Sequence, residues 1–88
     1  MDLYTGAVSF PYIVTGSGLK TVHFIMDEYE MGTETIASTE SSRTFNIPAQ
    51  PDGAHILTIY AEVENEGLIL KSNVLKIGMM WYSSTMTD

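Results

Sequence analysis

The fold of this chain is decided by residues 51–63, which read Pro51-Asp52-Gly53-Ala54-His55-Ile56-Leu57-Thr58-Ile59-Tyr60-Ala61-Glu62-Val63. The Pro-Asp-Gly group predicts a turn. After it, apolar side chains alternate with more polar ones, and the positions that share the apolar parity are His55, Leu57, Ile59, Ala61 and Val63. Alternation with a period of two is typical of a strand with one buried face. We therefore interpret this stretch as the central strand of a small β-sandwich.

Turn residues divide the rest of the chain into short segments of strand-like sequence. Strands are expected at residues 7–14, 19–27, 33–38, 43–47 and 68–82, with turns at 15–18, 28–32, 40–42 and 65–67. Because Pro11 cannot donate to a ladder, the first strand should lie at a sheet edge or change partners there. Ser72-Asn73 interrupts the last strand and predicts a bulge or a change of sheet.

No window of the sequence has the apolar spacing of an amphipathic helix, so the chain is predicted to be all-β. Six or seven short strands favour an antiparallel β-sandwich over residues 1–82, with residues 83–88 as a polar tail or linker. The expected core consists of inward-facing apolar residues: Val8, Phe10, Val22, Phe24, Ile36, Phe45, Ile47, Leu57, Ile59, Val63, Leu75 and Ile77.

The composition of the chain limits the kinds of partner that this domain is expected to bind. Four basic residues stand against eleven acidic ones, which gives a net charge of −7, and the cations are scattered singly. Nucleic acid and anionic membranes both require clustered Lys and Arg, so neither is an expected partner. The chain has no cysteine, and its apolar runs are far shorter than the ~20 residues that span a bilayer. Met1-Asp2-Leu3 does not resemble the start of a signal peptide. Neither a cofactor nor membrane insertion is predicted.

Four short patterns resemble the bacterial immunoglobulin-like domains: Val22-x-Phe24-x-x-Asp27, Phe45-x-Ile47-Pro48, Gly53-x-His55-x-Leu57-x-Ile59-x-Ala61 and Ser72-Asn73-x-Leu75. Such domains recur in tandem in cell-surface and phage virion proteins, and this sequence is similar to modules in large structural proteins of phages that infect gut Bacteroidetes. The resemblance covers residues 20–80. It implies a non-catalytic immunoglobulin-like scaffold on a surface or virion, whose partners are neighbouring domains or assembly proteins. The cysteine pair and early-strand Trp of antibody-type domains are absent.

Two histidines are the first candidates for chemistry. His55 lies on the apolar parity beside the turn, where its ring could cap backbone groups, and a ligand-binding or pH-sensing role is the alternative. Structural roles are accordingly assigned to Gly53, His55, Leu57 and Ile59. His23 is expected on a solvated strand face.

Two groups of carboxylates are the next candidates. Asp27, Glu28 and Glu30 cluster near a turn and could hold Ca²⁺ through oxygen ligands. Because no Asp-x-Asp-x-Asp-Gly loop is present, a solvated turn is preferred and no metal is predicted. The second group is Glu62, Glu64 and Glu66, which should project from one strand face and discourage edge pairing.

Three functions remain open for the chain. The preferred one is a non-enzymatic structural or spacer module with its ends at opposite poles of the fold. The second is a glycan-binding or adhesive module that uses Tyr60, Trp81 or Tyr82. Aromatic rings more commonly pack in a core or cover a sheet rim, which favours the first function. The third is a small hydrolase with a Ser-His-Asp arrangement, although the sequence contains no Gly-x-Ser-x-Gly elbow.

Overall fold

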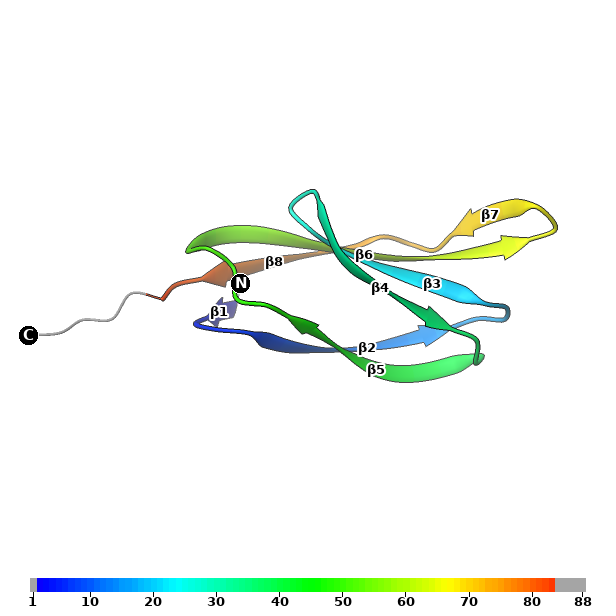
Figure 1. Ribbon diagram of the computed structural model, residues 1–88, viewed down its shortest axis with the longest axis horizontal. Helices are drawn as coiled ribbons and strands as arrows, with labels where there is room; N and C mark the ends of the chain where they lie inside the picture. The colour runs from blue at the N-terminus through cyan, green and yellow to red at the C-terminus, as the bar shows by residue number, and fades with distance from the viewer. Residues whose placement is uncertain (1, 84–88) are drawn as a thin grey trace, which may run out of the picture.

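The computed structural model describes residues 2–83 of the 88-residue chain, and it confirms an all-β domain of two sheets (Figure 1). The described strands are β1 (Asp2–Tyr4), β2 (Val8–Thr15), β3 (Lys20–Met26), β4 (Tyr29–Ile36), β5 (Glu40–Ile47), β6 (Gly53–Asn65), β7 (Leu68–Lys71) and β8 (Leu75–Trp81). Their number exceeds the six or seven predicted. The difference arises because β1 is too short to show alternation, and because the predicted strand at residues 68–82 is divided into β7 and β8.

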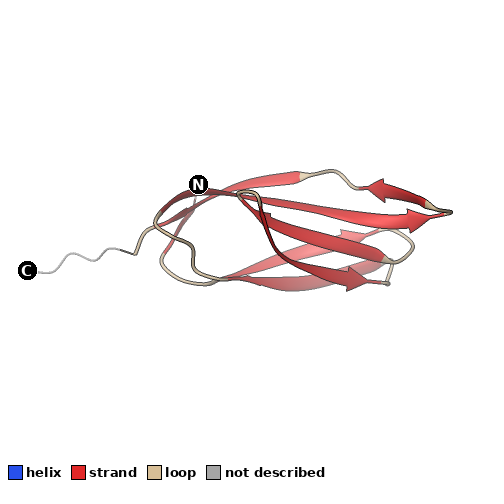
Figure 2. Cartoon of the chain, turned by 45° about the horizontal axis from the view of Figure 1, so that its top comes forward, coloured by secondary structure: helices blue, strands red, loops and turns tan. Residues whose placement is uncertain are grey.

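The larger sheet has the strand order β1-β8-β6-β3-β4, and β7 pairs with the far end of β6. The smaller sheet consists of β2 and β5 and packs against it as a second layer (Figure 2). β6 therefore lies in the middle of its sheet, as predicted for residues 51–63, and β2 is an edge strand, as predicted from Pro11. The expectation of a wholly antiparallel sandwich was wrong, because β1 runs parallel to β8.

The core lies between the two sheets. Its buried apolar residues are Val22, Phe24, Met26, Ile36, Ile47, Leu57, Ile59, Met79 and Trp81, and Val8, Phe10, Phe45 and Ile77 are packed against it while partly exposed. Two predicted core residues were wrong. Leu75 is 51% exposed because it borders an open groove, and Val63 lies outside the core cluster, against the turn at Gly18. Met26, Met79 and Trp81 complete the core instead.

Contacts between side chains of β2, β3, β4 and β5 join the two sheets. The Phe24 and Phe45 rings stack with centroids 3.9 Å apart. The Tyr12 hydroxyl donates a 2.6 Å hydrogen bond to Glu34 Oε1. Burial, with the nearby Glu34 carboxylate, raises the pKa of Tyr12 far above its usual value, so the phenol stays a donor.

Two predicted turns were wrong. The reversal expected at residues 28–32 takes only Asp27 and Glu28, and β4 begins at Tyr29. Glu40-Ser41-Ser42 belongs to β5 and pairs with Thr15, Val14 and Ile13. Both segments are polar edge strands, in which pairing with a neighbouring strand outweighs low intrinsic strand propensity.

The predicted interruption at Ser72-Asn73 is confirmed as a bulge. Lys71 pairs with Glu62 and Leu75 pairs with Ile59, so two residues of β6 (60 and 61) face three on the other side (72–74). Ser72 fills the gap, since its N–H donates to the Ala61 carbonyl at 2.8 Å and its hydroxyl accepts the Ala61 N–H at 2.8 Å. β7 and β8 remain in the same sheet.

Both described ends of the chain lie at one pole of the domain, and the β6–β7 hairpin lies at the other (Figure 1). Asp2 pairs beside Met79 and Tyr4 beside Trp81, and the Tyr82 N–H donates to the Tyr4 carbonyl at 2.9 Å. The expectation of ends at opposite poles was wrong, because the first strand joins the sheet alongside the last.

The predicted C-terminal linker lies outside the described residues except for Ser83. The N–H and the hydroxyl of Ser83 both donate to Asp52 Oδ1 at 2.9 Å. Between residues 2 and 83, the structure contains no helix with the length and apolarity that a membrane span requires.

Candidate functional site

A clamp of Asp27, His55 and Pro51 ties the β3–β4 turn to the start of β6. His55 Nδ1 lies 2.6 Å from Asp27 Oδ2, and Nε2 lies 2.7 Å from the Pro51 carbonyl oxygen. The other carboxylate oxygen of Asp27 accepts the Ile56 N–H at 2.9 Å. Asp27 adopts a positive φ of 57°, which an Asp side chain tolerates better than most. His55 thus joins the β3–β4 turn to the segment that leads into β6.

The electrostatics of this clamp favour the charged form of both partners. The hydrogen bond to Asp27, followed by the hydrogen bond to the Pro51 carbonyl, raises the pKa of His55. The Ile56 N–H, followed by His55, lowers the pKa of Asp27. Both ring nitrogens of His55 face acceptors, and only an imidazolium can donate to both at once. The pair is a structural ion pair.

A second polar cluster lies on the outer face of the larger sheet. His23 was expected to be solvated, but its side chain is only 17% exposed and lies between two carboxylates. Its Nδ1 is 2.5 Å from Glu30 Oε1, and its Nε2 is 2.6 Å from Glu62 Oε1. The His23 ring also stacks on Tyr60 with centroids 4.8 Å apart. Lys71 Nζ lies 4.1 Å from the centre of the Tyr60 ring.

The carboxylates do not gather around a metal position. The two that contact His23 lie at opposite ring nitrogens, and those of Asp27, Glu28 and Glu30 do not converge. Within the described part of the chain, no group of three or more His, Asp or Glu side chains is arranged to hold a metal ion.

The three aromatic residues considered for glycan stacking are not brought together. Trp81 is 1% exposed, its Nε1–H donates to the Gly6 carbonyl at 2.8 Å, and its ring closes the core. Tyr82 is 53% exposed at the pole where the chain ends lie. Tyr60 lies on the outer sheet face, where His23 and Lys71 occupy its ring. These positions do not form a common stacking surface.

The exposed ring that sequence reasoning missed is Tyr29, which is 80% exposed. Together with Tyr60, Ile56, Lys71 and Lys76 it lines an open depression on the outer face of the larger sheet. No sequence signal distinguished Tyr29, because its segment was expected to be a turn.

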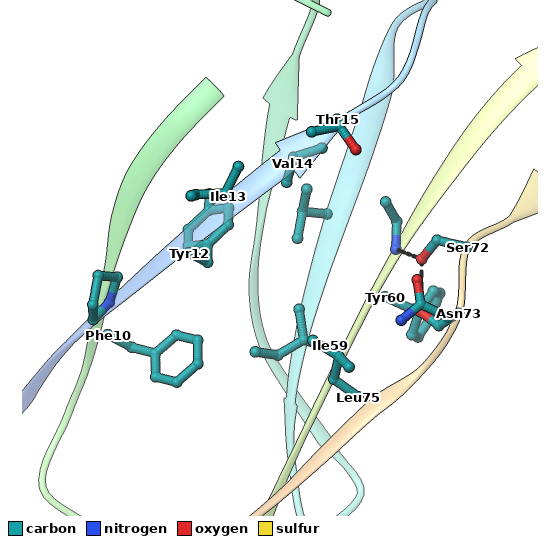
Figure 3. A pocket seen from close by; sticks show the side chains of 13 residues that line it. Phe10, Tyr12, Ile13, Val14, Thr15, Ile59, Tyr60, Ser72, Asn73 and Leu75 are labelled. Atoms are coloured by element: carbon teal, nitrogen blue, oxygen red, sulfur yellow. Dashed lines mark hydrogen bonds between the residues drawn. The ribbon is translucent and has the colours of Figure 1, made fainter. Parts of the chain in front are cut away.

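A groove of about 300 Å³ lies between β2 and the bulge that separates β7 from β8 (Figure 3). Phe10, Tyr12, Ile59 and Leu75 are among the residues that line it. Its lining contains no Asp, Glu, His, Lys or Arg, and the Ser72 hydroxyl is already bonded to Ala61 and Asn73. The groove offers apolar surface but no acid–base pair.

Lys20 is a buried cation that sequence reasoning did not anticipate. It is 4% exposed, and its ammonium donates to the carbonyl oxygens of Gly16, Gly18 and Ser38 at 2.6, 2.8 and 3.0 Å. All three N–H donors are therefore used. Lys20 joins the β2–β3 turn to the β4–β5 turn and is not available to a ligand.

The β6–β7 hairpin carries the largest run of exposed aliphatic residues in the described chain. Leu68, Ile69 and Leu70 are 66%, 68% and 47% exposed. The turn residues Glu66 and Gly67 have positive φ angles of 53° and 81°, which define a two-residue hairpin turn of type I′. The hairpin turn was predicted at residues 65–67, but the exposure of the strand after it was not.

Comparison of the chain with protein-family models, with curated proteins and with solved structures finds no match.

Proposed function

We propose that the chain is a non-enzymatic, immunoglobulin-like module of a larger surface or virion structural protein, and that it projects from that protein with the β6–β7 hairpin outward. The observation that carries the proposal is the parallel pairing of β1 with β8, which brings both described ends to one pole. A domain attached at one pole presents the opposite pole to its surroundings. The module therefore displays a surface and does not separate its neighbours in line.

The sheet arrangement supports the immunoglobulin-like part of this proposal. The β1–β2, β2–β3, β4–β5 and β5–β6 connections each pass from one sheet to the other. Crossing connections of this kind are typical of Greek-key sandwiches, which include the immunoglobulin-like domains. The four sequence patterns that resemble this family add to the same interpretation.

The use made of the polar residues supports a structural role. His55, Asp27 and Lys20, which have the side-chain chemistry that catalysis often uses, are all engaged in bonds that fasten turns. Such bonds fix the loops of a domain that has no disulfide to stabilise it. We infer that the selected property is a firm scaffold for the displayed pole.

The attachment geometry can be tested by fusing one compact carrier protein before residue 1 and another after residue 88, and measuring small-angle X-ray scattering. The proposal predicts two carriers near one another at one pole, with a scattering envelope that is broad at that end. Carriers separated by the length of the sandwich would contradict it. The control is the same pair of carriers joined by a helical spacer of similar length.

The second candidate function is glycan binding on the outer face of the larger sheet. The observation that favours it is the exposed Tyr29 ring beside Tyr60, because aromatic rings with an open face can pack against sugars. Titration with a glycan panel tests this candidate. Saturable binding that is lost in Tyr29→Ala but kept in Tyr82→Ala, a matched exposed tyrosine outside this depression, would favour it over the display module.

A further inference from the structure

The free edge of β7 is a surface suited to bind another strand. β7 pairs with β6 on one side only, and its Leu68, Ile69 and Leu70 side chains are exposed. We propose that this edge binds an extended segment of a partner protein in which basic and apolar residues alternate, and that the segment adds to the sheet as a further strand. This inference rests on the proposed function, in which the hairpin pole is the displayed surface.

The other outermost strands of the described sheets carry features that discourage such pairing. β2 contains Pro11, β1 has only three residues, and half of the residues of β4 and of β5 are Glu, Ser or Thr. Proteins commonly protect their sheet edges by proline, by charge or by short length. Among residues 2–83, only β7 presents three consecutive exposed aliphatic side chains at an edge.

The hydrogen-bonding phase of the hairpin leaves β7 backbone groups free. In an antiparallel pair, bonded and non-bonded residue pairs alternate. The Ser72 N–H bonds to the Ala61 carbonyl, so the alternation places Leu70 and Leu68 in bonded pairs with β6. The N–H and C=O groups of Ile69 and Lys71 therefore point away from β6, toward the free edge. An added strand finds donors and acceptors at these two residues.

Charge determines the composition of the partner segment. Glu64 lies opposite Ile69 on the outer face, and Glu66 is in the turn of the same hairpin, whereas Glu62 lies opposite Lys71 and already contacts His23. An added strand lies two strand spacings, about 9.6 Å, from β6, and a Lys or Arg side chain on it is long enough to extend over Ile69 toward the Glu64 carboxylate. On the opposite face, Leu68 and Leu70 favour apolar residues of the partner.

A second copy of this chain is a poor occupant of the edge. Each copy carries a net charge of −7, and pairing two β7 edges brings two sets of hairpin glutamates to the same sheet. Repulsion between like charges opposes that contact, most strongly at low salt. The observations favour a basic partner of a different kind.

The test is a titration of the isotopically labelled full chain, followed by NMR amide shifts. The probes are a capped Lys-Val-Lys-Val-Lys-Val peptide and its Glu-Val-Glu-Val-Glu-Val counterpart. We expect saturable shifts at residues 68–71 with the basic peptide only, and at least tenfold weaker binding in high salt. Equal binding of both peptides, shifts confined to other strands, or no shift at about 1 mM basic peptide would overturn the proposal.

Variants separate edge pairing from unspecific attraction. Ile69→Pro removes an N–H that faces the free edge and should weaken binding at least tenfold. Its matched control is Ile13→Pro, at a similarly exposed edge residue of β2, which should leave binding unchanged. The double variant Glu64→Lys/Glu66→Lys keeps the aliphatic edge. It should bind the acidic peptide more tightly than the basic one. Unchanged preference in that variant would contradict the charge argument.

Two further outcomes are distinguishable. Self-association of the wild-type chain in sedimentation, abolished by Ile69→Pro, would assign the edge to a second copy and overturn the basic-partner proposal. A failure of the carrier-fusion experiment, with peptide binding intact, would refute the attachment geometry but leave the β7 edge as a binding site.

Discussion

The imidazole of His55 lies 2.6 Å from the carboxylate of Asp27, although the two residues are 28 positions apart in the sequence. Asp27 forms the β3–β4 reversal, and His55 lies two residues into β6. The contact thus holds the turn against the central strand, and the Pro51 carbonyl extends it to the chain that enters this strand. Loss of either side chain leaves the other with an unmatched charge or donor.

The coupling between these two residues can be measured in a double-mutant cycle of Asp27→Asn and His55→Gln. We expect a coupling free energy of about 1 kcal/mol near pH 6, because the pair is charged and hydrogen-bonded but the Asp27 side chain is 45% exposed. Urea unfolding of the four proteins supplies the measurement. A cycle of Asp52→Asn with His55→Gln is the control, and strictly additive effects in the Asp27 cycle would refute the clamp.

The same pair predicts a stability maximum at weakly acidic pH. The pKa of His55 is raised in the folded state, so its contribution is complete below about pH 6.5 and is lost as the pH rises through the raised folded value. The pKa of Asp27 is lowered, so its contribution is complete above about pH 3.9 and is lost as the pH falls through the lowered value. Both contributions are therefore present between these limits.

The urea midpoint of the wild-type chain should accordingly be higher at about pH 5.5 than at about pH 8.5. His55→Gln should reduce this difference, because it removes the imidazole whose raised pKa lies between the two conditions. The same pH dependence in the wild type and in His55→Gln would show that other groups cause it.

Replacement of Lys20 by Met should destabilise the fold by about 2–4 kcal/mol. The three carbonyl groups of Gly16, Gly18 and Ser38 would lose the donors that Lys20 supplies to them. Lys76→Met is the matched control on an exposed residue, and its effect should stay within about 0.5 kcal/mol. Thermal unfolding measures the stability of both variants. An equal loss of stability in the two would contradict a special role for the buried Lys20 ammonium.

Replacement of Pro11 by Val should promote self-association of the chain. Pro11 lies in the middle of β2, whose second edge has no neighbour among the described strands, and it withholds an N–H from that edge. Ser9→Val adds the same side chain at a position on the same exposed face without changing the backbone at Pro11. Sedimentation velocity should show more dimer or larger species for Pro11→Val than for Ser9→Val. Equal behaviour would indicate that side-chain hydrophobicity alone matters.

Features that depend on local sequence were predictable. The alternation in residues 51–63 predicted the central strand, and Asn65-Glu66-Gly67 predicted the hairpin turn. Ser72-Asn73 predicted a bulge or a change of sheet, of which the structure has the bulge. Each has a signal within a few residues. The burial of Leu57 and Ile59 followed from the same parity, whereas Val63, which shares it, lies outside the core.

Features that depend on distant contacts were not predictable. β1 has three residues and acquires strand structure only because β8 lies beside it. Nothing in the sequence near Lys20 indicated that it would be buried, since its ammonium donates to carbonyls of two separate turns, β2–β3 and β4–β5. The position of the chain ends followed the β1–β8 pairing and could not be derived from composition. The exposure of β7 was not predictable for the same reason, because it depends on how far the smaller sheet of β2 and β5 extends over the larger one.

The proposed function requires that the domain is attached at one pole and displays the β6–β7 hairpin at the other. The chain has no cysteine, so spin labels can be placed freely in the pairs Asp2→Cys/Ser83→Cys and Glu66→Cys/Ser83→Cys. Electron–electron double resonance should give a distance below about 25 Å for the first pair and about 40 Å or more for the second, since the 13 residues of β6 span roughly 40 Å. A first distance as long as the second would contradict the claim.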